Sequence, residues 1–538
     1  MAKEEKSLAP AELAAARQAL AAARGKKRVD VILEARDPAA LVRALPADEL
    51  YFTIRDIGLA DAAALVPLAS PEQFRTLLDL DAWKADRLDP RRTLPWLRAA
   101  RAGAHLEPKA AARWTRKLRG LDPELLHLVL RDAIRLHDLE QDPDPELTSD
   151  RFMRTPENKY VIEFLLEGTD YLAVKGILDD LYYEDPFAAS RLLSAIQWDA
   201  PSELEESALR WRTGRLADLG HPSLEEALSW FARPPAIPAP HPAGAPARPA
   251  GFFLATLGRG SRLDQAAAAQ PPEERDALER EIIAAANAVL VADAVDVGDP
   301  DAVRAAFAAA RATLELGLDR LAGDDAARAA QVLAETPVKR LFQEGFGRIL
   351  ELKWRAERLL KAGGAGRREA PLLDAPLGEA VSALAAKRPR YFPGLEAPRE
   401  DWGSPAAGAF EPRRFLSSEE LACTADALAL GEGLAAIARD LALDAQVDGP
   451  LAPRLSTLYL TALANERLGR AFAPAPLAAG DLPAAARALA SIEDPRLAQR
   501  GEAGALLLEL ARAKASELAP LLEDGAVRPE HLGAVLVA

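Results

Sequence analysis

Residues 122–134 read DPELLHLVLRDAI, and this stretch predicts how the chain is built. Its Asp-Pro pair is a helix-start signal, because an Asp side chain caps free backbone N–H groups and Pro at the first helical position has no N–H to lose. Apolar residues then recur at helical spacing, at Leu126, Val129, Leu130, Ala133 and Ile134. We therefore expect a short helix with one buried face, packed among similar helices.

The same start signal recurs along the chain. Asp-Pro pairs begin at Asp37, Asp89, Asp122, Asp142, Asp144, Asp185, Asp299 and Asp494. Capping boxes, in which a Ser is followed three residues later by Glu or Gln, occur at Ser70, Ser202, Ser223 and Ser417. Start-to-start spacings near 33 residues before position 145 suit paired helices. The predicted fold is mostly α: an array of helical hairpins followed by one or two helical bundles.

One segment breaks the helical pattern. Residues 151–154 and 159–165 are two arms separated by a turn with Pro156 and Asn158, and the second arm is rich in β-branched and aromatic residues. Such runs flanking turn residues are typical of a β-hairpin. We therefore expect one small hairpin near residues 150–166.

Composition shifts predict the domain boundaries. Residues 233–250, RPPAIPAPHPAGAPARPA, are typical of an extended linker, and prolines recur between 388 and 415. The predicted parts are an N-terminal helix or tail (1–30), a helical array with the hairpin (31–232), a Pro/Ala-rich linker (233–250), a helical bundle (251–387), a Pro-rich connector (388–415) and a C-terminal helical segment (416–538).

Bulk charge and cysteine content limit the classes of function. The net charge of −15 disfavours binding to nucleic acid or to an anionic membrane surface. The single cysteine, Cys423, cannot form a disulfide framework or a Cys-based zinc site within one chain. Residues 1–30 lack a signal-peptide apolar core, and the longest apolar run, 282–292, is too short to span a bilayer. We expect a cytoplasmic protein without membrane insertion.

Searches for chemical motifs give little. Phosphate-loop, nucleophile-elbow and HExxH patterns are absent, so no cofactor, metal or catalytic residue is predicted. The acidic residues from Asp138 to Glu146 alternate as cation ligands do, but prolines interrupt them, which favours a solvated loop. A basic run, Arg113 to Arg119 around Trp114, suggests either nucleic-acid contact or pairing with neighbouring carboxylates, and the acidity of the chain favours pairing.

The densest polar and aromatic cluster lies between residues 198 and 221. At helical spacing Glu206 can pair with Arg210, and Trp211 can stack with Arg215. Such a cluster either fixes domain geometry or binds a ligand. The candidate binding residues are Trp198, Glu203, Glu206, Arg210, Trp211, Arg215, Asp218 and His221.

Three stretches resemble an uncharacterised bacterial family of unknown function: residues 45–58 (LPADELYFTIRDIG), 69–83 (ASPEQFRTLLDLDAW) and 201–220 (PSELEESALRWRTGRLADLG). The resemblance is strongest over 35–232 and weaker beyond the linker, where 458–470 (LYLTALANERLGR) is the best match. It implies no activity or cofactor. Residues 31–145 are also distantly similar to the cytoplasmic helical superhelix of MgtE-type magnesium transporters, which implies a helical array but not transport.

These observations favour a non-enzymatic scaffold or adaptor that binds protein partners, because stacked helices present broad surfaces. The alternative is an enzyme that acts on an anionic substrate through the Glu, Arg and Trp residues at 198–221. That alternative requires Glu203, Arg210 and Arg215 to line one concave pocket.

Overall fold

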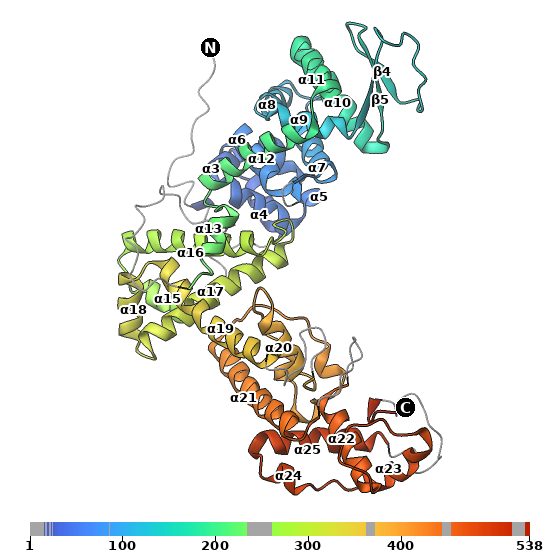
Figure 1. Cartoon of the computed structure of the whole chain (residues 1–538). Helices are drawn as coiled ribbons and strands as arrows, with labels where there is room; N and C mark the ends of the chain where they lie inside the picture. The colour runs from blue at the N-terminus through green and yellow to red at the C-terminus, as the bar shows by residue number, and fades with distance from the viewer. Residues whose placement is uncertain are drawn as a thin grey trace. The chain divides into compact units, whose positions relative to one another are not determined.

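The computed structural model describes residues 25–84, 87–233, 261–361, 372–443, 453–518 and 533–538, together with a few residues between 15 and 23. These residues are mostly helical and include two small antiparallel sheets, which confirms the predicted fold class (Figure 1). Most of the predicted N-terminal segment, 1–30, and all of the Pro/Ala-rich segment, 233–250, except Arg233 lie outside the described residues.

The chain forms two compact units, each described here by itself. Unit 1 takes its described residues from 1–232, 240–311 and 337–339, and unit 2 takes them from 233–239, 312–336 and 340–538. The helices of unit 1 are α2 (Lys26–Leu33), α3 (Pro38–Ala44), α4 (Ala47–Ile57), α5 (Leu59–Ala62), η1 (Ala63–Leu68), α6 (Pro71–Asp81), α7 (Pro90–Arg101), α8 (Pro108–Arg119), α9 (Pro123–Arg131), α10 (Gly168–Glu184), α11 (Pro186–Trp198), α12 (Pro201–Asp218), α13 (Leu224–Ser229), α15 (Arg262–Ala268), α16 (Pro272–Ala292) and the first half of α17 (Pro300–Ala322).

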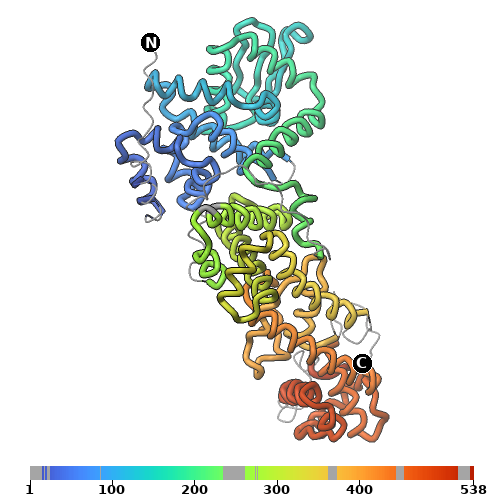
Figure 2. Tube along the Cα trace, turned by 90° about the vertical axis from the view of Figure 1, so that its left-hand side faces the viewer, coloured from blue at the N-terminus to red at the C-terminus, as the bar shows by residue number. Residues whose placement is uncertain are grey.

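Unit 2 contains the rest of α17 and the helices that follow it. These are α18 (Ala326–Glu335), α19 (Val338–Lys361), α20 (Leu377–Ala385), η2 (Pro393–Glu396), η3 (Arg399–Asp401), η4 (Ala406–Gly408), α21 (Ser418–Asp440), α22 (Leu455–Arg467), η5 (Ala479–Asp481), α23 (Leu482–Ala488), α24 (Pro495–Ala498) and α25 (Gly501–Ser516). Figure 2 shows α19 and α21 side by side, where Arg355 pairs with Glu432 at 3.0 Å.

Most of the Asp-Pro signals begin a helix, as predicted. The side chains of Asp37, Asp89, Asp185, Asp299 and Asp494 each accept a hydrogen bond from a backbone N–H of the first helical turn. Such caps satisfy backbone donors that have no partner within the helix.

Three Asp-Pro sites behave differently. Asp142 and Asp144 lie in an irregular loop, as the proline-interrupted acidic pattern predicted, and begin no helix. Proline disfavours helical backbone geometry in the residue before it. Asp142 and Asp144 each precede a proline, so both positions resist helix formation. Asp122 begins α9 but its carboxylate does not cap the helix; it pairs with Arg215 at 2.7 Å instead.

The structure confirms some of the predicted capping boxes and contradicts one. Those at Ser70 and Ser223 form in full, and Ser417 caps α21. The box predicted at Ser202 is wrong, because α12 already begins at Pro201 with Ala200 as its N-cap residue. Proline suits the first helical position, so it places the helix start one residue ahead of the serine.

The hairpin near 150–166 forms, and the structure adds a third strand to it. β4 (Phe152–Arg154) pairs antiparallel with β5 (Tyr160–Phe164), and Asn158 takes a positive φ of 57° in the turn. β3 (Ile134–Asp138) pairs with the other edge of β5, giving the order β3-β5-β4. α9 therefore ends at Arg131, and Ile134 lies in a strand rather than on the predicted helix face. A second sheet joins β1 (Trp83–Lys84) and β2 (Arg87–Leu88).

The segments on either side of the Pro/Ala-rich stretch pack together inside unit 1. Ala227 on α13 and Ala288 and Ala292 on α16 form a small buried cluster, against which Trp230 and Phe231 pack. Because alanine has only a methyl side chain, these two helices approach closely. The N-terminal array therefore shares one compact unit with α15, α16 and the first half of α17.

The core of unit 2 contains two apolar helices. Every residue from 455 to 465 on α22 is buried. α21 is the one helix in the described part of the chain that is long and apolar enough, by length and composition, to cross a membrane. Its apolar window is 56% buried inside the structure.

The proline-rich residues 388–415 are packed into unit 2. They form η2, η3 and η4, and bury Tyr391, Phe392 and Trp402. Tyr391 and Arg413 exchange two backbone hydrogen bonds, of 2.7 and 3.0 Å. Aromatic burial and these hydrogen bonds hold a segment that has no long helix of its own.

Candidate functional site

Helix α12 carries most of the candidate residues, and its two sides differ. Five candidates are exposed on one side, which we call the outer face of α12: Glu203, Glu206, Arg210, Trp211 and Asp218. Only Ala208 is fully buried on the opposite, inner face. An 18-residue helix with so little buried apolar surface needs polar contacts to attach to its neighbours.

Arginines supply those contacts. Arg215 donates two hydrogen bonds to the carboxylate of Asp79, at 2.7 and 2.9 Å, and pairs with Asp122 at 2.7 Å. The Nε of Arg212 donates to the backbone oxygen of Asp79 at 2.7 Å, and its guanidinium lies 5.2 Å from the ring centre of Trp83. α12 is thus attached to α6 and α9 by a charge network, which we call the Asp79 network.

Burial shifts the pKa values of the groups in this network. Burial raises the pKa of the Asp79 carboxyl, and the hydrogen bonds from Arg215 oppose that shift without cancelling it. Burial lowers the pKa of Arg212. His221, beyond the C-terminal end of α12, is also buried; burial and the charge of Arg212 lower its pKa to about 4, so its imidazole is neutral at pH 7.

The structure therefore separates the candidate residues. Arg215 and His221 belong to the inner side, while the outer face and Trp198, at the end of α11, are exposed. The predicted pairing of Glu206 with Arg210 does not form, because Arg210 contacts Ser207 at 3.5 Å instead. The predicted stacking of Trp211 on Arg215 is also wrong: the lone buried carboxylate of Asp79 attracts the guanidinium inward.

A second network, which the sequence analysis missed, centres on Asp81. Its carboxylate accepts hydrogen bonds from the Tyr51 hydroxyl at 3.0 Å and the Trp96 indole N–H at 2.6 Å, and lies 3.7 Å from Arg55. Arg55 also donates to the carbonyl of Gly298, between α16 and α17. The signal for both networks is the pattern LLDLD at the end of α6, where two carboxylates stand among buried leucines.

These networks satisfy buried charges and join helices, which is a structural role. Burial of Tyr51 and the adjacent Asp81 raise the pKa of its hydroxyl well above the ordinary value, so the phenol stays protonated. Arg92 pairs with Asp296, which lies between α16 and α17, and the hydrogen bond from Arg92 lowers the pKa of the Asp296 carboxyl. The carboxylates of Asp79, Asp81 and Asp296 are each paired with side chains of the protein itself.

The basic run at 113–119 lies on α8, and Arg119 is its one cation that pairs with a carboxylate among the described residues. Arg119 pairs with Glu184 at 2.6 Å, and the indole of Trp114 donates to Asp180 at 2.7 Å. Lys117 points into the core, where its Nζ donates to the carbonyl of Pro67 at 2.9 Å. Burial and nearby arginines lower the pKa of Lys117 to about 7.

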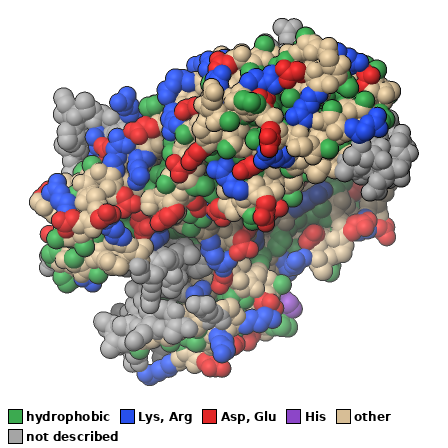
Figure 3. Space-filling model, turned by 90° about the horizontal axis from the view of Figure 1, so that it is seen from below, with side chains coloured by type: hydrophobic (Ala, Val, Ile, Leu, Met, Phe, Trp, Pro, Cys, Tyr) green, Lys and Arg blue, Asp and Glu red, His purple; other side chains and the backbone are tan. Residues whose placement is uncertain are grey.

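No metal centre is found among the described residues, since no three His, Cys, Asp or Glu side chains gather as ligands there. The acidic segment 138–146 forms local turns instead: the Asp138 carboxylate accepts from the N–H of Glu140, and that of Asp142 from the N–H of Asp144. The face of the molecule in Figure 3 shows acidic and basic side chains interspersed.

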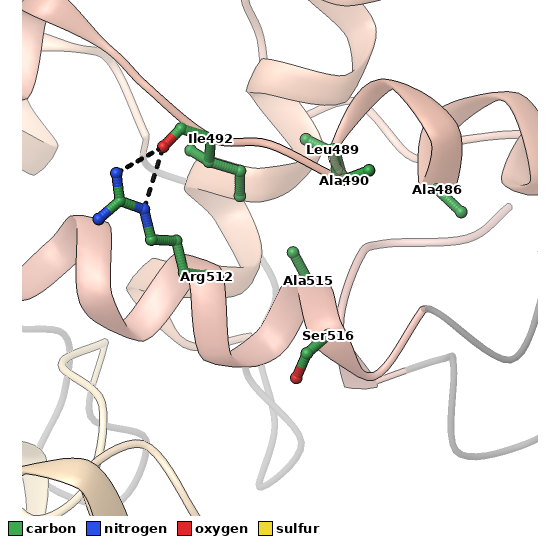
Figure 4. Close-up of a pocket in the computed structure, with 7 residues that line it drawn as sticks. All are labelled: Ala486, Leu489, Ala490, Ile492, Arg512, Ala515 and Ser516. Carbon is green, nitrogen blue, oxygen red and sulfur yellow. Dashed lines mark hydrogen bonds between the residues drawn. The ribbon is translucent and has the colours of Figure 1, made fainter.

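A shallow pocket in unit 2 lies between α23 and α25. It has a volume of about 280 Å³ and is lined mostly by alanine and aliphatic side chains (Figure 4). Its one charged residue, Arg512, donates two hydrogen bonds to the carbonyl of Ile492, at 3.0 and 2.8 Å, and the Ser516 hydroxyl donates to Ala513. These polar groups are used within the protein, so the pocket offers little to orient a substrate.

Large exposed side chains gather instead on α10, α11 and α12. Tyr183 and Phe187, at the tip of the α10–α11 hairpin, are 88% and 83% exposed, and Trp198 and Trp211 are 68% and 54% exposed. Aromatic rings of this size normally contribute to a core. Their exposure in one stretch of the chain marks a surface rather than a chemical centre.

Comparison with known families agrees with the sequence resemblance and extends it. Residues 5–526 match the model of a family of unknown function, DUF6178. The chain belongs to this family. Membership covers nearly the whole sequence, so α15 to α25 belong to the DUF6178 pattern together with the N-terminal array.

The other comparisons find no relatives. No curated protein and no solved structure matches the chain. The distant similarity of residues 31–145 to MgtE-type transporters therefore has no support.

Proposed function

We propose that this DUF6178 protein is a non-enzymatic scaffold or adaptor that acts in the cytoplasm and binds other proteins through α10, α11 and α12. The observation that carries the proposal is the exposure of four aromatic rings in this one stretch. Tyr and Trp side chains are enriched among the residues that carry most of the binding energy of protein interfaces.

The polar chemistry of unit 1 supports the same proposal. The carboxylate of Asp79 is paired with Arg215, and this contact attaches α12, which carries Trp211, to α6. The enzyme alternative requires Glu203, Arg210 and Arg215 in one cavity. Because Arg215 turns inward while the other two are exposed, the arrangement favours binding over catalysis.

Site-specific photo-crosslinking in the native cell tests the proposal. A photoreactive amino acid replaces Phe187 or Trp211 in the full-length chain, and Leu106, which is 74% exposed on another part of unit 1, serves as the matched control. We expect discrete protein adducts from positions 187 and 211 and none from 106. Equal adducts at all three positions, or none at 187 and 211, would reject an interaction surface on α10–α12.

A further inference from the structure

We propose that the outer face of α12 binds an arginine-rich segment of a protein partner. This inference rests on the function proposed above and adds the chemistry of the partner. Glu203, Glu206 and Asp218 are exposed on this face and form no ion pair with another described residue. Three free carboxylates along one side of a helix form a row to which cationic side chains can pair.

The surroundings of the outer face strengthen its negative charge. Residues 165–228 contain 13 Asp and Glu but only five Lys and Arg, a net charge of −8. Four arginines from other segments pair with acids of this stretch and leave it at −4: Arg151 with Glu167, Arg98 with Asp170, Arg101 with Asp180 and Arg119 with Glu184. Arg212 and Arg215 are turned toward Asp79, and Lys175 pairs with Asp179 at 2.8 Å. Arg210 is exposed on the outer face itself, so the five residues of that face carry three carboxylates and one cation. A cationic partner is therefore attracted over a distance as well as on contact.

Exposed indole rings make arginine the fitting cation. Trp198 lies just before α12 and Trp211 within it, both largely exposed. A guanidinium stacks on an indole face while it pairs with a carboxylate, which an ammonium does less well. The chain already uses this geometry elsewhere: the guanidinium of Arg399 lies 4.4 Å from the ring centre of Trp402.

Other occupants fit this surface less well. A second copy that docks through the same face would oppose carboxylate to carboxylate, because a twofold interface brings identical patches together. Anionic lipid and nucleic acid are repelled for the same reason. An arginine-rich protein segment satisfies both the free carboxylates and the free rings.

The test measures binding of two fluorescent probes to the full-length protein by anisotropy: a short peptide of alternating Ala and Arg, and its Lys counterpart. The charge variant is Glu203→Gln with Glu206→Gln and Asp218→Asn. Its matched control, Asp142→Asn with Asp144→Asn and Glu146→Gln, removes the same charge from another exposed loop of unit 1. The aromatic variant is Trp198→Ser with Trp211→Ser, and its control is Tyr183→Ser with Phe187→Ser.

We expect the charge variant to weaken binding of the Arg peptide by about tenfold or more, and its control by less than about twofold. The wild type should prefer the Arg peptide to the Lys peptide by about fivefold, a preference that the aromatic variant loses and its control keeps. If the charge variant and its control weaken binding of the Arg peptide equally, net charge alone explains the binding, and the inference is overturned. Absence of peptide binding, with specific crosslinks still formed at position 211, would remove the arginine-rich partner but leave the proposed function intact.

Discussion

The strongest prediction concerns Arg215, which we expect to hold α12 to the rest of unit 1. In Arg215→Met the carboxylate of Asp79, which has no exposed surface, loses two hydrogen bonds and its nearest cation. Breaking a buried ion pair by removing one partner typically costs about 3–5 kcal/mol. Because the pKa of Asp79 is already raised, the carboxyl can take up a proton, and we expect the lower end of that range, about 3 kcal/mol.

Thermal unfolding of the full-length protein, followed by tryptophan fluorescence, measures this loss. Six of the eight tryptophans lie in residues 1–232, so the signal reports mainly on unit 1. A loss of about 3 kcal/mol corresponds to a fall of roughly 6–12 °C in the midpoint for a domain of this size. The matched control is Arg210→Met on the exposed face of the same helix, which should change the midpoint by less than about 1 °C.

Two further measurements test the reasoning. The deficit of Arg215→Met should shrink as the pH falls below the raised pKa of Asp79, because a protonated carboxyl no longer needs the guanidinium. Adding Asp79→Leu should restore part of the stability, since replacing both members of a buried pair costs less than leaving one alone. If Arg215→Met unfolds at the same temperature as Arg210→Met, the Asp79 network does not attach α12.

Three other changes have defined outcomes. Lys117→Met should raise the free energy of unfolding of unit 1 at pH 6 by about 1–4 kcal/mol. Burial lowers the pKa of Lys117 to about 7, so the wild type regains stability as the pH rises from 7 toward 10.5. Urea titrations across this pH range should show the difference in stability between the variant and the wild type closing. His221→Leu should flatten the loss of stability between pH 6.5 and 4, because the folded imidazole has a pKa of about 4 and resists protonation while the unfolded one accepts it; an unchanged acid profile would contradict this. In α19, Gly345→Ala would place its Cβ 1.9 Å from the backbone oxygen of Thr313 and should destabilise unit 2 by at least about 2 kcal/mol. Gly347→Ala meets nothing within 4 Å and should stabilise the helix by about 0.5–1 kcal/mol. If calorimetry shows that both variants change stability in the same direction, the close crossing of α17 and α19 is refuted.

Local chemistry made the helices predictable from sequence. An Asp or Ser cap acts within one turn, so the starts at Asp37 and Ser70 could be located without knowing what packs on them. The hairpin arms at 152–154 and 160–164 were equally local. β3 was missed because Ile134 continues the apolar spacing of α9, and only its pairing with Phe164, thirty positions away, makes it a strand.

The candidate site was predictable as a segment but not as an arrangement. The sequence located the cluster at 198–221 from its density of Trp, Arg and Glu, and helical spacing suggested that Glu206 and Arg210 pair. Spacing does not say which side of the helix faces a neighbour. That depends on Asp79, which lies more than a hundred residues earlier and attracts Arg215 and Arg212 inward, leaving the carboxylates and Trp211 outside.

The close packing of α13 on α16 has a consequence for how this protein can be divided. Residues before 233 and residues 261–311 belong to one compact unit, so a chain cut at an engineered protease site between 233 and 261 should yield two fragments that copurify. Expressing either fragment alone would expose the alanine cluster. It would also separate the guanidinium groups of Arg55 and Arg92 from their partners in residues 296–298. Truncations made at the proline-rich stretch 233–250 would then lose partner binding because the fragments misfold, and not because a partner site was removed.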